Sequence, residues 1–525
     1  MGPPASLRRV LLLYVPSALV MLAVLLPMSY LVIRALQVDT ASLGMLLRTR
    51  TLRLMSNSLA LAAAVTGTSG LLSVTVAWLT VRTDLPGRRI WSVLTSLPLV
   101  IPSYVGAYLL AAALGPRGML QSGLEPLLGI QRLPDIYGFW GAYLALTLLS
   151  YPYVLIPVRA SLRGMDPALE ESARSLGHDS WGVFRRVTLP HLRPALIAGA
   201  VLVALYTLRD FGAVSIMRFT TFTRAIYIQY QSALDRSSAA VLSLVLVALT
   251  VLLLSVELRS RRTEQIYGSA ENGHGRQARL ALGPWRWPAL LLCGSLVSLA
   301  LVLPAGVLTY WLVRALQEGP DITTLLQATR NSMLASGLAA LITLVAATPL
   351  AVLGARSPGR WSRWTERFSH VGFALPGIVI ALALVFFGIR AALPLYQTLP
   401  MLLLAYLILF LPQAVGALRS SMLQVPVILE EAGRSLGRGP ISVFLRVTLP
   451  LVRPGLVAGA ALVFLTTMKE LQATLILSPF GFNTLATEVW SAVSEAFFAR
   501  AAGPALLLIL VSSLPMAYFA LRDDD

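Results

Sequence analysis

The chain is almost without lysine. Of its 42 basic residues only one, Lys469, is a lysine, and the others are arginines. The phosphate-binding loop of nucleotide-binding proteins, G-x-x-x-x-G-K-[ST], requires a lysine of its own. The four residues before Lys469 contain no glycine. The sequence therefore excludes ATP binding through that motif.

Cysteine and histidine are also scarce. The single cysteine, Cys293, lies in an apolar run and excludes an internal disulfide. The four histidines stand singly, with no carboxylate or cysteine at metal-ligand spacing, and none lies in a predicted membrane span. A membrane-embedded enzyme would need several converging catalytic groups. We therefore predict no enzyme activity, no resident cofactor and no metal site. The histidines are His178, His191, His274 and His370.

Charged residues make up only 13% of the 525 residues, against 56% hydrophobic residues, and the mean hydropathy is +0.74. This composition is typical of a chain that lives in a bilayer. The net charge of +18 comes from arginines between apolar stretches, not from one basic stripe with interleaved aromatics. We therefore expect the chain to reside in a lipid bilayer and not to bind nucleic acid.

Twelve apolar segments approach the roughly 20 residues that a membrane-spanning helix needs. They predict an all-α membrane protein, and Val10–Ile33 is too long for a signal-peptide core, so we expect it to be retained. The first six are Val10–Ile33, Ser58–Val81, Ile90–Leu114, Ile136–Val158, Pro194–Met217 and Ala239–Val256. The other six are Pro288–Leu312, Asn331–Leu353, Val371–Ile389, Pro400–Leu418, Pro454–Leu477 and Pro504–Leu521.

Arginine clusters predict the orientation, because basic residues near span ends are held on the cytoplasmic side. The clusters put both termini in the cytoplasm of a multi-pass protein of the bacterial inner membrane. A few arginines, such as Arg48 and Arg218, fall in the outer loops, so the rule holds only as a bias. The cytoplasmic clusters are Arg8-Arg9, Arg82 with Arg88-Arg89, Arg159 to Arg193, Arg259 to Arg286, Arg356 to Arg367 and Arg419 to Arg453.

The chain is a tandem repeat. Asn57-Ser58 recurs as Asn331-Ser332, an offset of 274 residues, and from Pro152, which matches Pro412, the offset is 260. We predict two six-helix halves, residues 1–258 and 288–525, joined by a polar cytoplasmic linker, residues 259–287. Six spans per half is an even number, so the halves insert in parallel about an axis along the membrane normal.

The loop between the fourth and fifth spans repeats most closely. The first copy reads E-E-S-A-R-S-L-G from Glu170 and the second E-E-A-G-R-S-L-G from Glu430, each followed by V-T-L-P. In the first copy Asp166 can cap a short helix whose first residue is Pro167. Gly177 can end that helix in a left-handed conformation. An ordinary surface helix is the alternative interpretation.

This loop resembles the E-A-A-x-x-x-G-x9-I-x-L-P loop of binding-protein-dependent ABC importer permeases. The two copies keep the family's spacing in register and differ mildly from its usual residues, for example with Ser172 and Gly433 in place of Ala. The resemblance implies that each loop is a coupling helix for a separate ATPase subunit that binds the ATP. It assigns this role to Glu170, Glu171, Gly177, Pro190, Glu430, Glu431, Gly437 and Pro450.

The segments after these loops resemble ferric-iron permeases, the first from Leu208 to Val214 and the second from Met468 to Thr474. That family usually has proline at the place of Gln472. Fused thiamine permeases share the D-F-G pattern and remain an alternative. The resemblance implies an importer permease for ferric iron that works with a periplasmic binding protein and two ATPase copies. A secondary transporter of two parallel six-helix repeats is the rival class.

Two charged pairs occupy equivalent places in the fifth spans. Arg209-Asp210 and Lys469-Glu470 lie about fifteen residues into these segments, at an offset of 260 residues. Intramembrane charges usually face a bundle interior or a water-filled cavity. They predict either a polar lining of the translocation path or a structural salt bridge between helices.

Overall fold

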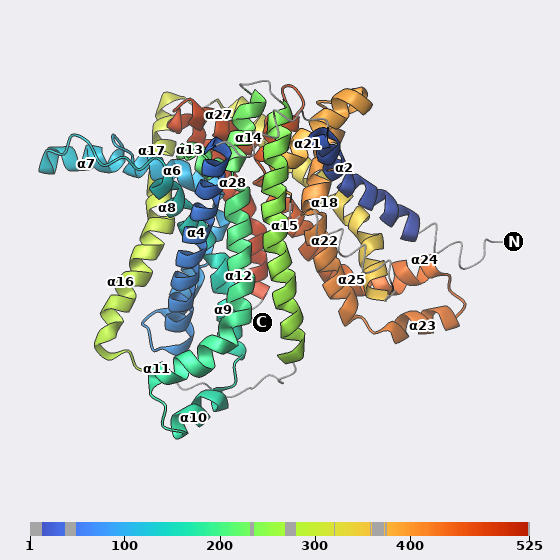
Figure 1. Ribbon diagram of the computed structural model, residues 1–525, viewed down its shortest axis with the longest axis horizontal. Coiled ribbons are helices and arrows are strands. Elements are labelled where there is room, and N and C mark those ends of the chain that lie inside the picture. The colour runs from blue at the N-terminus through green and yellow to red at the C-terminus, as the bar shows by residue number, and fades with distance from the viewer. Residues whose placement is uncertain are drawn as a thin grey trace.

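The computed structural model describes residues 13–36, 49–231, 236–267, 280–319, 321–356, 359, 372 and 375–522, with the backbone only for 34–36, 236–237, 256–267 and 514–522. The described part is helical, and its one isolated β-bridge joins Thr83 and Leu280. Two helix bundles lie side by side (Figure 1). The predicted start of the first span at Val10, the start of the ninth at Val371 and linker residues 268–279 lie outside the described residues.

Helices of the first half overlap the six predicted spans, but several differ from them in their bounds or are divided into shorter helices. Their bounds are α2 Val15–Leu36, α4 Thr49–Arg82, α5 Arg88–Leu94, η3 Leu97–Val100, α6 Ser103–Leu114, α7 Met119–Leu128, α8 Phe139–Ser150, α9 Pro152–Gly164, α10 Pro167–Ser175, α11 Ser180–Val183, η4 Phe184–Thr188, α12 Leu189–Arg209, α13 Gly212–Ile216, α14 Phe222–Gln231 and α15 Arg236–Tyr267.

The second half repeats this order with a shorter connection after its third span. Its bounds are η5 Gly283–Trp285, α16 Arg286–Val297, η6 Ser298–Val302, α17 Leu303–Glu318, α18 Ile322–Arg356, α21 Gly377–Ala391, η7 Leu393–Leu395, α22 Leu399–Gln424, α23 Val427–Ser435, α24 Pro440–Val443, η8 Phe444–Thr448, α25 Leu449–Met468, α26 Gln472–Leu477, α27 Leu485–Ser494 and α28 Phe498–Arg522.

The all-helical fold in two halves is confirmed, but fewer helices than twelve have full spanning length. In the described part of the chain, nine helices are long and apolar enough to cross a bilayer, or ten if one bent pair counts as a span. Two shorter apolar helices, Gly377–Ala391 and Phe498–Ser513, occupy the places of the ninth and twelfth predicted spans. In hydrocarbon a helix satisfies all its own backbone groups, which explains why these apolar segments are helical.

The third span of the first half is bent and not straight. Its two parts, Arg88–Val100 and Ser103–Leu128, meet at an angle of 102°. Ile101 precedes Pro102 and is extended, with ψ 122°. The ring of a proline disfavours the helical conformation of the residue before it, so the helix must break here.

The fifth span of each half is broken, contrary to the prediction that the charged pairs lie inside continuous helices. In the first half α12 ends at Arg209, and the short helix α13 begins at Gly212. In the second half α25 ends at Met468, and α26 begins at Gln472. The charged pairs therefore lie at helix breaks, where backbone groups need side-chain partners.

The two halves exchange their first helices (Figure 1). Helix α2 of the first half packs against α21 of the second half, and α17 of the second half packs against α6 of the first. Tyr30 of α2 stacks on Phe386 of α21 with ring centroids 5.2 Å apart. The halves are thus interlocked and not merely tethered by the linker.

Small residues allow the helices within each half to approach closely. A Cβ atom at Gly199 of α12 would meet the Val154 Cα atom of α9 at 2.7 Å. At the equivalent Gly459 of α25, a Cβ atom would meet the Ala417 Cβ atom of α22 at 3.4 Å. Close approach through small residues is typical of helix packing in membranes.

Candidate functional site

Each repeated loop forms a short helix, α10 in the first half and α23 in the second, here called the motif helices. They lie on the same lower side of the molecule, each at the end of its own bundle (Figure 1). The Asp166 Oδ1 atom accepts a hydrogen bond from the Ala168 backbone N–H at 2.9 Å, which confirms the predicted cap. Helix α23 begins after Pro426 and has no side-chain cap.

Both motif helices end in a left-handed glycine, as predicted. Gly177 has φ 89° and Gly437 has φ 76°. A Cβ atom at either position would meet nothing within 4 Å. Glycine is therefore required here for its backbone conformation and not for lack of space.

Glu170 anchors the first motif helix to the bundle. Its side chain is buried, at 6% exposure for the residue. One carboxylate oxygen, Oε1, accepts a hydrogen bond from the Thr188 hydroxyl at 2.9 Å and lies 3.3 Å from the Arg82 guanidinium. Arg82 ends α4, and Thr188 lies directly before α12. The carboxylate thus ties the motif helix to two spanning helices.

The same three-way contact recurs around Glu430 in the second motif helix. Its Oε1 atom lies 2.9 Å from the Arg356 guanidinium at the end of α18 and accepts from the Thr448 hydroxyl at 3.2 Å. Arg434, one turn on, lies 3.4 Å from the other carboxylate oxygen. Moving either motif helix away from its spans would leave a charge without its partner, which is unfavourable. These ion pairs therefore hold the motif helices to the spans.

These contacts assign different positions to the two neighbouring glutamates. Glu171 and Glu431 are exposed, unlike Glu170 and Glu430. Sequence reasoning treated the two glutamates of each loop alike and missed the anchoring partners, which are Arg82, Thr188, Arg356 and Thr448. The repeat could have pointed to these partners. Arg82 matches Arg356 at the offset of 274 residues found in the second span, and Thr188 matches Thr448 at the offset of 260 residues found in the loop.

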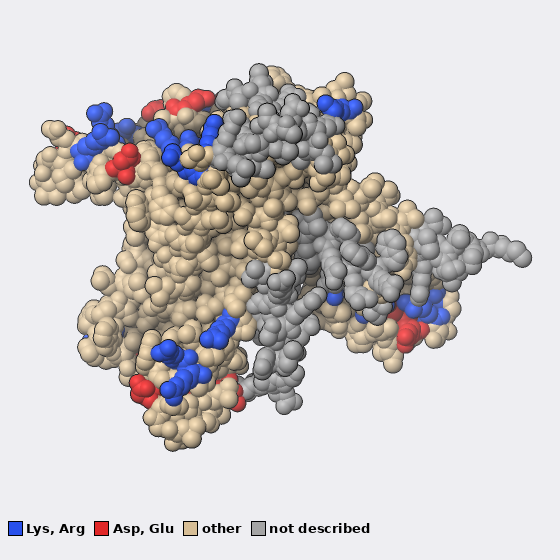
Figure 2. All heavy atoms as spheres, in the orientation of Figure 1, with Lys and Arg blue, Asp and Glu red and all other residues tan. Residues whose placement is uncertain are grey.

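The tips of the motif helices offer apolar surface beside these charges. Leu176 and Leu436 are each 80% exposed, and Trp181 is 67% exposed. Figure 2 shows basic and acidic side chains gathered over both motif helices. Exposed leucines rimmed by charges are typical of a protein interaction surface.

Pro190 and Pro450 are each the second residue of the following span, α12 or α25. A π-helical turn precedes each span, and the Leu189 N–H donates to the Phe184 carbonyl. Proline lacks a backbone N–H and is favoured at the first turn of a helix, although α12 and α25 also contain Pro194 and Pro454 in their interiors. Pro190 and Pro450 thus lie where the π-helical turn passes into each span.

Asp210 closes the helix break of the first half. Its Oδ1 atom accepts from the Ala213 N–H at 2.9 Å and from the Val214 N–H at 3.3 Å, and the residue is buried. The Ser103 hydroxyl lies beside the same carboxylate. Asp210 thus acts as the cap of α13, a role that a charge within a continuous helix would not have.

In the second half, the break is joined to the first half. Glu470 Oε1 accepts from the Ala473 N–H at 3.0 Å. The Lys469 ammonium donates to the Leu99 carbonyl at 3.3 Å. Gln472 donates to the Arg209 carbonyl at 2.7 Å. The two breaks therefore face each other across the boundary between the halves.

Gln472 departs from the proline usual in the ferric-iron permeases that the segment resembles, and its side chain uses both ends of its amide. The nitrogen reaches the first half, and the oxygen accepts from the Ile378 N–H of α21 at 3.0 Å. A proline has no side-chain amide to make either bond. The glutamine thus links α12 and α21 through α26.

The structure brings all four predicted charges to one place. Arg209 and Glu470, from different halves, are close enough for their opposite charges to interact. Asp210 and Glu470 are held by backbone N–H groups of the helices that follow them. The arrangement combines helix capping with a partly buried polar cluster at the boundary between the halves, which fits both alternatives set out above. Their role in transport stays a prediction.

Gly377 offers a direct test of the Glu470 geometry. A Cβ atom at Gly377 would lie 2.7 Å from Glu470 Oε1. Gly377→Ala is expected to displace the carboxylate from its N–H partner and to destabilise the protein by about 1–3 kcal/mol through overpacking. Thermal unfolding of the detergent-solubilised protein measures the effect. Gly67→Ala, where a Cβ atom meets nothing within 4 Å, is the matched control, and equal melting temperatures for the two variants would contradict the prediction.

Within the residues that the structure describes, no three His, Cys, Asp or Glu side chains gather in a way that could hold a metal ion. The central cluster offers two carboxylates among cationic groups, and their oxygens are already engaged by backbone donors. Each carboxylate therefore already has one oxygen that caps the helix that follows it.

Comparison with known proteins adds a family. The model of the inner membrane component of binding-protein-dependent transport systems matches residues 69–265 and 347–522. The Fe(3+)-transport system permease protein FbpB 2 of Haemophilus influenzae is 35% identical over 511 residues, 95% of this chain and 96% of that protein.

Two further relatives are more distant or shorter. The ferric transport system permease protein FbpB of Actinobacillus pleuropneumoniae is 23% identical over 490 residues, 89% of this chain and 70% of that protein. The molybdenum transport system permease protein ModB of Escherichia coli is 34% identical over 186 residues, which is 34% of this chain and 80% of that protein. The long match thus runs through both halves, and the short one covers about a third of the chain.

Proposed function

This chain belongs to the family of inner membrane components of binding-protein-dependent transport systems, and from that premise we propose that it is the permease through which an ATP-driven importer moves ferric iron into the cell. Membership implies a binding protein and an ATPase as partners. The cargo is inferred from the relative that matches 95% of the chain, a permease named for Fe(3+) transport.

The observation that carries the importer function is the pair of motif helices. Each presents an exposed glutamate and an exposed leucine, and each is tied by a buried carboxylate to two spanning helices. When a bound ATPase moves a motif helix, these contacts would therefore move the spanning helices with it, because the connection does not depend on a flexible loop. We infer two ATPase copies, one for each motif helix.

Reconstitution of the permease with its ATPase and binding protein in liposomes tests the cargo. We expect ATP-dependent uptake of Fe3+ delivered by the loaded binding protein, and none with a proton gradient alone. ATP-dependent uptake of thiamine or molybdate in place of iron would overturn the cargo and keep the importer. Uptake driven by an ion gradient without ATP would overturn both.

Substitution of the terminal glycines tests the coupling role. Gly177→Val with Gly437→Val forces a β-branched residue into a left-handed conformation, which costs about 1–2 kcal/mol per residue. We expect the helix ends to unwind and uptake to fall about tenfold or more, while the protein still reaches the membrane. The matched control is Gly67→Val with Gly337→Val, at positions with no atom within 4 Å of a Cβ. Unchanged uptake with the ATPase still bound would contradict the coupling role.

We also propose that the motif helices and both termini face the cytoplasm of a bacterial cell. The proposal is supported by the arginine bias of the sequence. It also agrees with the proposed ATPase binding at the motif helices, because the ATPase uses ATP from the cytoplasm.

Cysteine labelling tests this orientation. Ser180→Cys, beside α10, should resist a membrane-impermeant thiol reagent in intact cells and react after lysis. Gln131→Cys, in the exposed segment after α7, should react in intact cells. The native Cys293 is buried and serves as the background. The reverse labelling pattern would invert the topology.

A further inference from the structure

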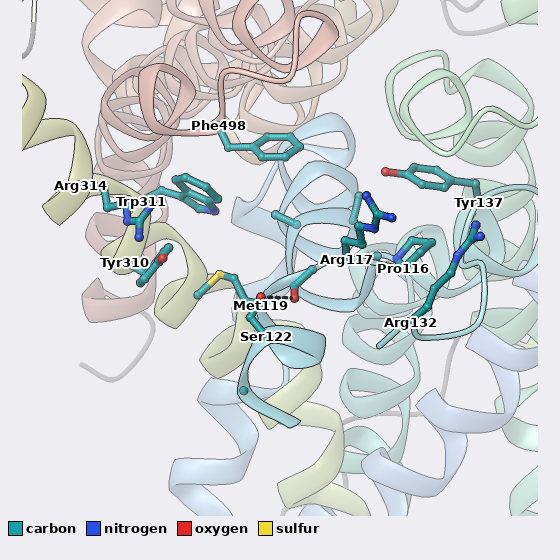
Figure 3. Close-up of a pocket in the computed structure, with 15 residues that line it drawn as sticks. Pro116, Arg117, Met119, Ser122, Arg132, Tyr137, Tyr310, Trp311, Arg314 and Phe498 are labelled. Atoms are coloured by element: carbon teal, nitrogen blue, oxygen red, sulfur yellow. Dashed lines mark hydrogen bonds between the residues drawn. The ribbon is translucent and has the colours of Figure 1, made fainter. Parts of the chain in front are cut away.

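A cavity of about 920 Å³ lies between α6, α7 and α17, far from the motif helices (Figures 1 and 3). Arg117 and Arg132 reach it from the segments that flank α7, and Arg314 reaches it from α17 on the other side (Figure 3). No acidic side chain lines the cavity. In the described part of the chain, none of these three arginines forms an ion pair with a carboxylate. The cavity therefore carries positive charge that the protein does not neutralise.

The other walls are aromatic. Tyr137, Tyr310 and Trp311 line the cavity, and the Arg314 guanidinium lies over the Tyr310 ring, 5.2 Å from its centroid. The Trp311 ring points toward the cavity (Figure 3), but its indole nitrogen is buried where a water-sized group does not reach it. Three guanidinium groups beside aromatic walls favour an oxyanion.

The insertion that forms one wall of this cavity is present only in the first half. Between the third and fourth spans the repeat offset falls from 274 to 260, so the first half holds 14 more residues there. Those residues form α7 and its flanks. An offset of 274 matches Ala112 of the cavity wall with Phe386, which in the second half stacks on Tyr30 of the exchanged helix α2. In the second half the aromatic rings of Phe386 and Tyr30 thus occupy the place where the first half has the small side chain of Ala112 and a cavity.

The depth of the cavity in the membrane follows from the helix α16–α17. Its exposed residue Trp287 marks one edge of the bilayer, since exposed Trp and Tyr concentrate at the interfaces. Tyr310 lies 23 residues later, which is about 34 Å at 1.5 Å per residue. The hydrocarbon core is about 30 Å thick. The cavity therefore opens at the headgroup level of the leaflet opposite the motif helices.

Helix α7 extends outward from the bundle at this level (Figure 1), and Figure 2 shows both basic and acidic side chains over this part of the molecule. Its residues Leu120, Leu127 and Leu128 are 46%, 79% and 67% exposed. An amphipathic helix with such a face lies in the membrane interface. Exposed leucines beside an arginine cavity fit acyl chains next to a phosphate, and they do not fit the acidic, water-facing surface of a protein.

We propose that the cavity binds the headgroup of an anionic phospholipid, with its phosphate between Arg117, Arg132 and Arg314 and its acyl chains along α7. Each basic side chain beside an anionic lipid headgroup adds to the attraction. The bound lipid holds the insertion of the first half against the exchanged helix α17 of the second half. The site is independent of the cargo.

The test uses the full chain with its ATPase in nanodiscs of phosphatidylglycerol mixed with phosphatidylcholine. Native mass spectrometry counts the lipid that remains bound after gentle delipidation, without any uptake measurement. We expect the protein to retain phosphatidylglycerol over phosphatidylcholine. The substitutions Arg117→Gln, Arg132→Gln and Arg314→Gln together should reduce that preference about tenfold or more. Arg50→Gln, Arg53→Gln and Arg330→Gln, at exposed arginines outside the cavity, should leave it unchanged.

Three results would overturn the proposal. The first is equal lipid preference in the cavity variant and the control. The second is displacement of the lipid by millimolar inorganic phosphate, which would assign the site to a free anion. The third is weaker affinity of the cavity variant than of the control for the binding protein in pure phosphatidylcholine nanodiscs, which would make the cavity a docking surface for acidic side chains. If the triple variant fails to fold, the single substitution Arg314→Gln removes one of the three charges and should lower the preference several-fold.

Discussion

Replacing Glu170 and Glu430 with glutamine is expected to abolish most uptake while the chain still enters the membrane. Each substitution leaves an arginine, the buried Arg82 or the partly buried Arg356, without its counter-charge. Breaking a buried pair in this way typically costs about 3–5 kcal/mol. We expect the motif helix to detach from its spans, so that uptake falls at least about tenfold and the melting temperature drops. ATP hydrolysis would no longer respond to the loaded binding protein.

The neighbouring glutamates supply the matched control. Glu171→Gln with Glu431→Gln changes the same charge one residue further on, at exposed positions. Surface changes of this kind usually alter stability by less than about 0.5 kcal/mol. We expect normal stability in this control, with weaker ATPase binding if these residues contact the partner. Wild-type uptake by a stable Glu170→Gln, Glu430→Gln variant would show that the buried anchors transmit nothing.

Removing the two intramembrane acidic charges is expected to stop transport without unfolding the protein. In Asp210→Asn with Glu470→Gln, the side-chain oxygens still accept from the Ala213 and Ala473 N–H groups that they cap. The caps are kept and only the charge is lost. If the acids line the path, the variant binds its ATPase normally and loses uptake of a cation.

The comparison with alanine separates capping from charge. Asp210→Ala with Glu470→Ala removes both, and loss of a cap costs about 0.5–2 kcal/mol. If the acids are only structural, the alanine variant loses stability, and the amide variant transports normally. If breaking the charge pairing is itself harmful, yield and melting temperature of the amide variant fall before uptake does. Normal stability and uptake in both variants would exclude either role.

Several features of the molecule could be predicted from the sequence because they depend on local composition and spacing. An apolar run of about 20 residues has few alternatives to a helix in a bilayer. The motif loops were recognisable because glycine and proline at fixed spacing determine where a short helix ends and the next begins. The predicted left-handed glycines Gly177 and Gly437 are confirmed.

Other features depend on side chains that are distant in the chain. Continuous fifth spans were predicted, but the structure breaks both, because Asp210 and Glu470 satisfy the backbone of the helices that follow them. A hydropathy pattern cannot show such a break, since the flanking residues are as apolar as those of an unbroken helix.

By itself, the sequence determined the membrane class, the duplication of the chain and the place of the two motif helices. Only the tertiary structure decided which glutamate of each pair is buried, that the halves exchange their first helices, and that the insertion around α7 encloses a cavity. The physical reason is that burial depends on which distant segments meet. Glu170 is buried because Arg82 lies across from it, 88 residues away in the chain, and Glu171 points to solvent.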